Sequence, residues 1–226
     1  FGTIWFTLVA GLAVLILFYI ANWYKEQIAY NKSKEKAQNK KTNVVPKNIL
    51  RFALFLIVFI VFGRSWYISA MSNFYAFYVI DHYGTSIAKA QIFIFVFLLM
   101  GALGTFFGGP IADRFGKKNV ILFSFLIPAP FALLLPYVNY YGALIILGII
   151  GLLIMSSFSV SVVYAQELVP GKIGTMSGLI VGLAFGMGAI GSIVFGIVID
   201  AVGISLTMII VSLLPLVGLF SFFLPS

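Results

Sequence analysis

The sequence has no cysteine and a single histidine, His82. Disulfides, thiolate metal sites and histidine clusters are therefore excluded within it. It also has no P-loop of the form G-x-x-x-x-G-K-[ST] and no cofactor fingerprint between a strand and a helix. Charge is scarce, because only 9% of the residues are charged, against about 25% in a typical soluble domain. We expect no metal, no cofactor and no catalytic constellation, so the sequence does not predict an enzyme.

Long apolar segments fill most of the chain. Its 226 residues are 62% hydrophobic, and the mean hydropathy is +1.13. About 20 apolar residues in a helix cross the hydrocarbon core of a bilayer, and a helix satisfies its own backbone hydrogen bonds there. The sequence therefore predicts an all-α membrane protein with seven transmembrane helices. We place the spans at residues 1–24, 50–79, 88–109, 119–138, 141–165, 174–199 and 203–224.

The basic residues gather on one side of this topology. Of the 14 Lys and Arg residues, all but Arg64 and Lys89 lie in or beside the first, third and fifth loops. Cytoplasmic loops of membrane proteins carry this excess. The net charge of +8 is thus explained by topology, and we expect no nucleic acid partner. The pattern predicts a multi-pass protein of a bacterial inner membrane, with its linker and C-terminus in the cytoplasm.

One long polar stretch divides the chain. We interpret residues 1–24 as the last helix of an N-terminal bundle, since the chain opens at Phe1 without Met or a basic leader. Residues 25–49 form a cytoplasmic linker, and residues 50–226 form a six-helix transmembrane bundle. A single linker before six tightly connected spans is typical of two-bundle transporters. The remaining N-terminal bundle is then a partner that this sequence lacks.

A glycine-rich basic segment joins the third and fourth spans. Residues 109–118 read GPIADRFGKK, and glycine permits a tight turn between two helix ends. An acid beside basic residues can contact a neighbouring helix end. The alternative is a generic cytoplasmic turn. We expect a role in conformational change for Gly109, Asp113, Arg114, Gly116, Lys117 and Lys118.

An arginine lies within the second span. Arg64 is near mid-depth, where a cation costs several kcal/mol without a partner or a water-filled cavity. We expect it to hold an anionic substrate in a central cavity. Tyr67, Met71 and Tyr75 share its helical face and are predicted to line the same cavity. The alternative is a structural ion pair, or hydrogen bonds from Arg64 to carbonyl groups.

Small residues mark the fifth and sixth spans. Ser157 and Ser161 share a face, and their hydroxyl groups could contact substrate, although packing and bonding to carbonyls are equally ordinary roles. Gly178, Gly182 and Gly186 are spaced by four and would let another helix approach closely. That contact could slide during transport or be static.

Four segments resemble the fosmidomycin-resistance family within the Major Facilitator Superfamily. The 109–118 segment is similar to the superfamily signature G-x-x-x-D-R-x-G-[RK]-[RK], here in its second-half position. The others are residues 74–84 (FYAFYVIDHYG), 164–174 (YAQELVPGKIG) and 213–219 (LLPLVGL). The resemblance implies twelve helices in two bundles, of which this chain would hold helices six to twelve.

The resemblance also implies proton-driven efflux of a drug such as the phosphonate antibiotic fosmidomycin. A phosphonate suits Arg64, because guanidinium pairs well with such anions. The partners would be a small molecule, protons and the lipid bilayer. The titrating carboxylate is expected in the absent half, with Glu167, assigned to the conformational machinery, as the fallback within this chain. Import of a nutrient anion by the same fold, or a non-transporting scaffold or receptor, are the alternatives.

Overall fold

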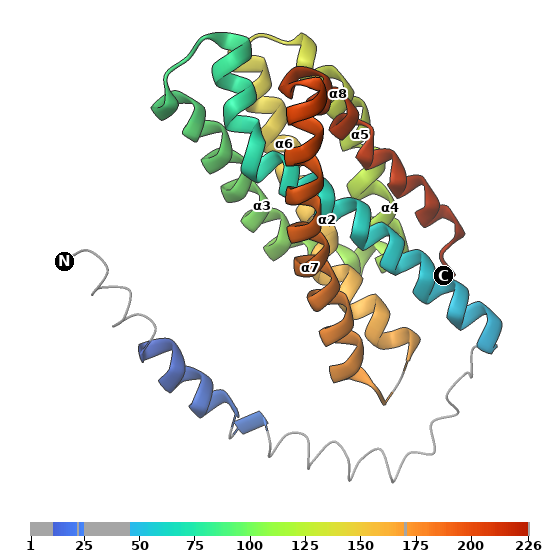
Figure 1. The fold of residues 1–226 in the computed structure, drawn as a ribbon. Coiled ribbons are helices and arrows are strands. Elements are labelled where there is room, and N and C mark those ends of the chain that lie inside the picture. Colours follow the sequence, from blue (N-terminus) through green and yellow to red (C-terminus); the bar gives the residue numbers. More distant parts are fainter. Residues whose placement is uncertain (1–10, 22, 25–45, 170, 226) are drawn as a thin grey trace, which may run out of the picture. The chain divides into compact units, whose positions relative to one another are not determined.

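The computed structural model describes residues 11–21, 23–24, 46–169 and 171–225 (Figure 1). Contacts divide the chain into two units, residues 1–44 and 45–226. The first contains an apolar helix at Gly11–Ala21 whose side chains are exposed. The rest of the span predicted at 1–24, apart from residues 23–24, and the linker up to residue 45 lie outside the described residues.

The second unit is a helical bundle. Its elements run in the order α2 Lys47–Tyr83, α3 Ile87–Phe115, α4 Lys117–Leu126, α5 Pro128–Leu134, η1 Leu135–Tyr137, α6 Tyr140–Leu168, α7 Ile173–Val202, α8 Ile204–Ser212 and η2 Leu214–Phe223. Helix α2 extends along the bundle and contacts α7 (Figure 1). Because α2 begins at Lys47, the last residues of the predicted linker are already helical.

Six stretches of this unit are long and apolar enough to cross a membrane. They are Asn48–Tyr83, Ile87–Phe115, Lys117–Tyr137, Tyr140–Leu168, Ile173–Val202 and Ile204–Phe223. No strand occurs among the described residues. The all-α membrane fold is therefore confirmed, and the chain is part of a multi-pass membrane protein.

Two spans are composite. Helices α4 and α5 meet at Ile127–Pro128, where proline supplies no amide for the helical ladder. The last span changes from α-helix to 3₁₀-helix at Leu214–Pro215. Both breaks coincide with proline, and in each case the chain continues in the same membrane-crossing stretch.

The connection between α3 and α4 is shorter than predicted. Residues 109–115 belong to α3, which contains Pro110 and ends at Phe115. The prediction of a turn over this whole segment is wrong, because α3 continues through Pro110 to Phe115. Only Gly116 separates the two helices, with φ of 88°. That angle is readily adopted by glycine and rarely by other residues.

Glycines bring α3 and α6 into close contact. A Cβ atom built on Gly104 would overlap the carbonyl oxygen of Leu152, and one on Gly108 would overlap that of Ser156. Between these positions a hydrogen bond joins the two helices: the Thr105 hydroxyl donates to the Met155 carbonyl at 3.2 Å. This close approach forms one wall of the site described next.

Candidate functional site: a cavity around Arg64

A cavity of about 420 Å³ lies among α2, α3, α6 and α7. Arg64 reaches it from the middle of α2, between two hydrophobic clusters of the core. On the α2 sequence, Val61 belongs to one cluster and Tyr67 to the other. Arg64 therefore places a cation at the junction of two apolar regions, at mid-depth in a transmembrane helix.

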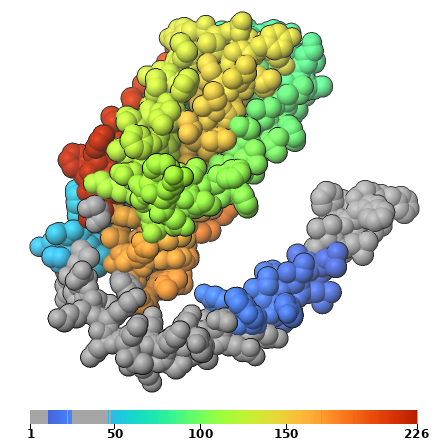
Figure 2. Space-filling model, turned by 180° about the vertical axis from the view of Figure 1, so that it is seen from behind, coloured from blue at the N-terminus to red at the C-terminus, as the bar shows by residue number. Residues whose placement is uncertain are grey.

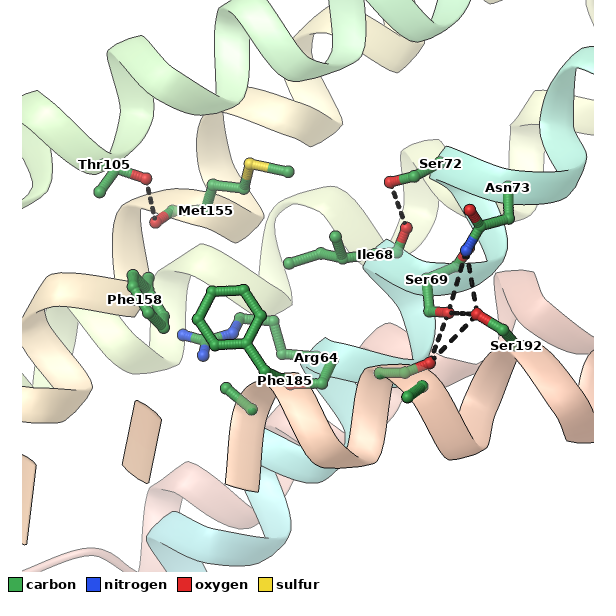
Figure 3. A pocket seen from close by; sticks show the side chains of 14 residues that line it. Arg64, Ile68, Ser69, Ser72, Asn73, Thr105, Met155, Phe158, Phe185 and Ser192 are labelled. Atoms are coloured by element: carbon green, nitrogen blue, oxygen red, sulfur yellow. Dashed lines mark hydrogen bonds between the residues drawn. The ribbon is translucent and has the colours of Figure 1, made fainter. Parts of the chain in front are cut away.

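The Arg64 guanidinium lacks polar partners within the described part of the chain. The residue is only 1% exposed, and its Nε and Nη1 atoms have no hydrogen-bond acceptor there. Its Cζ atom lies 4.7 Å from the centre of the Phe158 ring on α6, a cation–π distance. Figure 3 shows the guanidinium directed toward Phe158. A buried cation without an acceptor is costly and is well suited to receive an anion.

A hydrogen-bonded cluster occupies another part of the cavity, where α2 meets α7. The Ser69 hydroxyl donates to the Gly188 carbonyl at 2.7 Å and lies 2.6 Å from the Ser192 hydroxyl. The Asn73 amide donates to the Ser192 oxygen at 3.0 Å. Figure 3 shows these side chains away from the guanidinium end. The cavity thus has a cationic end and a neutral polar end.

Three predicted cavity residues lie elsewhere. Tyr67, Met71 and Tyr75 are each 1% exposed and pack in the hydrophobic core, and they do not line the cavity around Arg64. The Tyr75 ring packs at 5.9 Å from that of Phe93 on α3. The tyrosine hydroxyls have no partner among the described residues. The structure thus brings these residues together in the core of the bundle.

The two predicted serines of α6 bond to their own helix. Ser157 donates to the Ile154 carbonyl at 2.8 Å, and Ser161 donates to the Ser157 carbonyl at 2.6 Å. Both are buried, and neither lines the cavity. Phe158, which adjoins Ser157, is the residue of this segment that contacts Arg64.

Sequence reasoning missed the polar face of α2. Ser65, Ser69 and Ser72 follow one another at i, i+4 and i+7, and with Asn73 they line the cavity. This spacing is a visible helical stripe of small polar residues. The prediction favours the adjacent stripe of larger residues, because aromatic and thioether groups also suit a cavity wall.

The predicted conformational segment lies at one end of the bundle, where α3 meets α4. Lys117 at the start of α4 forms an ion pair with Glu167 near the end of α6, at 2.9 Å. Asp113 and Arg114 are exposed on the last turn of α3, and Lys118 is partly exposed. A Cβ atom on Gly109 would meet nothing within 4 Å. The structure therefore joins the predicted segment 109–118 to Glu167 through Lys117.

The glycines of α7 fall into two sets. A Cβ atom on Gly178, Gly182 or Gly186 would meet no described atom within 4 Å. Further along the helix, Gly191 packs against Trp66 of α2, where an added Cβ would lie 3.2 Å from the ring. A close contact between α7 and α2 thus occurs at Gly191, whereas the three predicted glycines contact no described residue in this way.

Comparison with known proteins is consistent with this architecture. A model of the Major Facilitator Superfamily matches residues 1–191. An uncharacterized MFS-type transporter of Bacillus subtilis (strain 168), YfnC, is 56% identical over 228 residues, which covers 100% of this chain and 56% of the relative. The fosmidomycin resistance protein of Escherichia coli (strain K12) is 42% identical over 222 residues, which covers 98% of this chain and 54% of the relative.

The extent of these matches defines what is shared. This chain spans about half the length of each of the two relatives. The family match covers most of its residues and includes α2, α3, α4, α5 and α6 in full. The predicted family is confirmed: the chain belongs to the Major Facilitator Superfamily of transporters.

Proposed function

We propose that this chain is the C-terminal part of a proton-coupled antiporter that exports a small anionic or amphiphilic compound, such as a phosphonate antibiotic. Residues 1–24 would be the last helix of the N-terminal bundle, and residues 50–226 the C-terminal bundle. The basic linker and the C-terminus would lie in the cytoplasm of a bacterium, by the distribution of Lys and Arg.

The observation that carries the proposal is the unpaired guanidinium of Arg64. Its Nε and Nη1 atoms have no acceptor among the described residues, and the side chain opens on a cavity of about 420 Å³. A phosphonate or carboxylate oxygen would accept charge-assisted hydrogen bonds there, in a region of low dielectric constant. The size favours a small molecule over a peptide.

The neutral end of the cavity supports a substrate with two kinds of polar group. Arg64 and Asn73 are nine residues apart on α2, which is about 13 Å along a helix. An anionic group near Arg64 would leave the other end of a short molecule beside Ser69, Asn73 and Ser192. Their hydroxyl and amide groups can donate hydrogen bonds to, and accept them from, an amide or hydroxyl group of the substrate.

Proton coupling is assigned to the other half of the transporter. The carboxylates in the described part of the chain are Asp81, Asp113, Glu167 and Asp200, all of them exposed. None lines the cavity around Arg64. Glu167 is held by Lys117, so it serves better as a structural partner than as the carrier of the transported proton.

Export can be tested in cells with the complete transporter. A phosphonate-sensitive bacterium would express the wild type, Arg64→Ala, Arg64→Lys or Arg51→Ala, in which the last removes an exposed cation at the start of α2. We expect Arg64→Ala to lose protection against the drug, Arg64→Lys to keep part of it, and Arg51→Ala to keep all of it. Membrane abundance of each variant is the control.

The direction of transport and its coupling to protons can be measured in membrane vesicles. In everted vesicles with an acidic interior, exported phosphonate enters the lumen as protons leave, so adding it should discharge the pH gradient. Arg64→Ala should abolish that discharge. Full protection by Arg64→Ala would refute the anion site, whereas phosphonate uptake into intact cells through the same protein would indicate import.

A further inference from the structure

A second cavity, separate from the one at Arg64, opens along α3 and α4. It has a volume of about 670 Å³, and α6 forms its base. Phe107 and Ile111 line it from α3, Phe123 lines it from α4, and Ile127 lines it from the junction of α4 and α5. All four are exposed by 43% or more. Figure 2 shows α6, in gold, at the surface between green α3 and yellow-green α4. We call this feature the α3–α4 groove.

The walls of the α3–α4 groove are almost entirely hydrocarbon. Its two serines use their hydroxyls internally, since Ser124 donates to the Ile121 carbonyl at 2.7 Å and Ser156 donates to that of Leu153 at 2.6 Å. From Gly104 to Phe115 the groove follows α3 over eleven helical steps, about 16 Å. That length matches half of a hydrocarbon core about 30 Å thick. The groove suits an acyl chain within one leaflet.

A cation lies beside one end of the groove. Arg114 follows Ile111 by three residues and Phe107 by seven, so it lies on the same side of α3 as these two lining residues, next to the groove and not within its lining. Its Cζ atom is 5.8 Å from the ring centre of Phe115, which also lines the groove. Among the described residues, the ion pair found at this end joins Lys117 to Glu167, and none is found for Arg114.

The α4 side of this end offers further donors. Helix α4 begins after Gly116 with no acidic residue in its first turn and no side-chain cap. Its first backbone N–H groups are therefore available, and such groups favour phosphate. The Asn119 side chain lines the groove beside them and donates to the Phe115 carbonyl at 3.0 Å. Asp113 is a nearby acid on a neighbouring face of α3. It is not paired with Lys117, which binds Glu167 instead.

We propose that the α3–α4 groove binds one phospholipid with a net negative headgroup. One acyl chain would lie against Phe107, Ile111 and Phe123, and the phosphate would contact Arg114 and the first amides of α4. A neutral amphiphile would fill the groove equally well but would gain nothing from the cation. A zwitterionic lipid carries an ammonium group in its own headgroup, which would weaken the attraction between its phosphate and Arg114.

Lipid quenching of a reporter tryptophan tests this proposal. The complete transporter carrying Phe123→Trp would be reconstituted in phosphatidylcholine vesicles containing a minor fraction of brominated phosphatidylglycerol or of brominated phosphatidylcholine. The quenching due to Trp at this position is the difference between proteins with and without the substitution. We expect phosphatidylglycerol to associate about fivefold more strongly, the effect of one cation facing an anionic lipid.

Charge variants made in the same reporter protein identify the cation. Arg114→Gln should bring the two lipids to equal quenching, and Arg114→Lys should keep the preference. Arg51→Gln removes an exposed cation on α2 and should also keep it. The proposal is overturned by equal quenching in the parent, by a preference that survives Arg114→Gln, or by no quenching from either lipid, which would show that protein covers the groove.

Discussion

The guanidinium carbon of Arg64 and the aromatic ring of Phe158 lie 4.7 Å apart, across the contact between α2 and α6. The ring partly compensates a cation that has no acceptor for Nε and Nη1 within the described residues. It cannot replace the lost hydration in full, because a buried charge requires hydrogen-bonding partners. Arg64 is therefore retained at a cost in stability.

The first prediction concerns that cost. Arg64→Met replaces the buried cation with an apolar side chain of similar length and should raise the Tm of the purified transporter without substrate by a few degrees. The same variant should fail to transport an anion. Arg64→Lys, which keeps the charge, should not raise the Tm. A marked fall in Tm for Arg64→Met would show that an acid elsewhere in the transporter already pairs with Arg64.

The second prediction separates two serines of α2. Ser69→Ala removes the hydrogen bonds to Gly188 and Ser192 on α7 and should lower the free energy of unfolding by about 1 kcal/mol. Ser72 bonds only within its own helix, to the Ile68 carbonyl, so Ser72→Ala should change it by less than about half of that. Thermal unfolding in detergent measures both. Equal losses in the free energy of unfolding would mean that the hydrogen bonds between α2 and α7 stabilise the protein no more than the bond within α2.

A third prediction compares two glycines of α3. Gly104→Ala would place Cβ against the backbone carbonyl of Leu152, so α3 and α6 must separate, at a cost of about 1–3 kcal/mol. Gly109 faces open space, so Gly109→Ala should be neutral or stabilise the helix by up to about 1 kcal/mol. Retained folded yield on size-exclusion chromatography is the measurement. A Gly104→Ala protein as stable as the wild type would contradict the observed close packing.

The fourth prediction concerns the ion pair between Lys117 and Glu167. The Glu167 side chain is 60% exposed, so the pair should contribute less than about 1 kcal/mol to stability. Lys117→Glu should destabilise the transporter through repulsion, and the double variant Lys117→Glu, Glu167→Lys should restore it. Raising the salt concentration should shrink both effects. Lys118→Glu is the control, since no partner is found for Lys118 among the described residues, and it should gain nothing from Glu167→Lys.

Much of the fold follows from the sequence because a bilayer allows few solutions. Apolar length alone locates the six spans of the second unit, and each of the six spans predicted from residue 50 onward overlaps an observed one. Helix ends were less predictable. The sequence predicts that Pro110 lies in a turn, yet α3 continues to Phe115 and the break between α3 and α4 falls at Gly116. Local propensity does not reveal which of several glycines adopts a positive φ.

The site was predictable in its centre and not in its walls. A lone arginine in an apolar span indicates a buried charge whatever surrounds it. Which residues surround it depends on how α2 is rotated against α6 and α7, and hydropathy does not distinguish two apolar faces of a membrane helix. Ser69 lines the cavity and Tyr67 lies in the core, because the smaller side chains allow α7 to approach at Gly188.

The single residue between α3 and α4 limits how these helices can move. With only Gly116 between them, there is no slack to absorb a displacement of α3 along its own axis. Such a displacement would act directly on the start of α4, where Lys117 pairs with Glu167 of α6. The end of α3, the start of α4 and the end of α6 are thereby connected, so a shift of one would be felt at the other two.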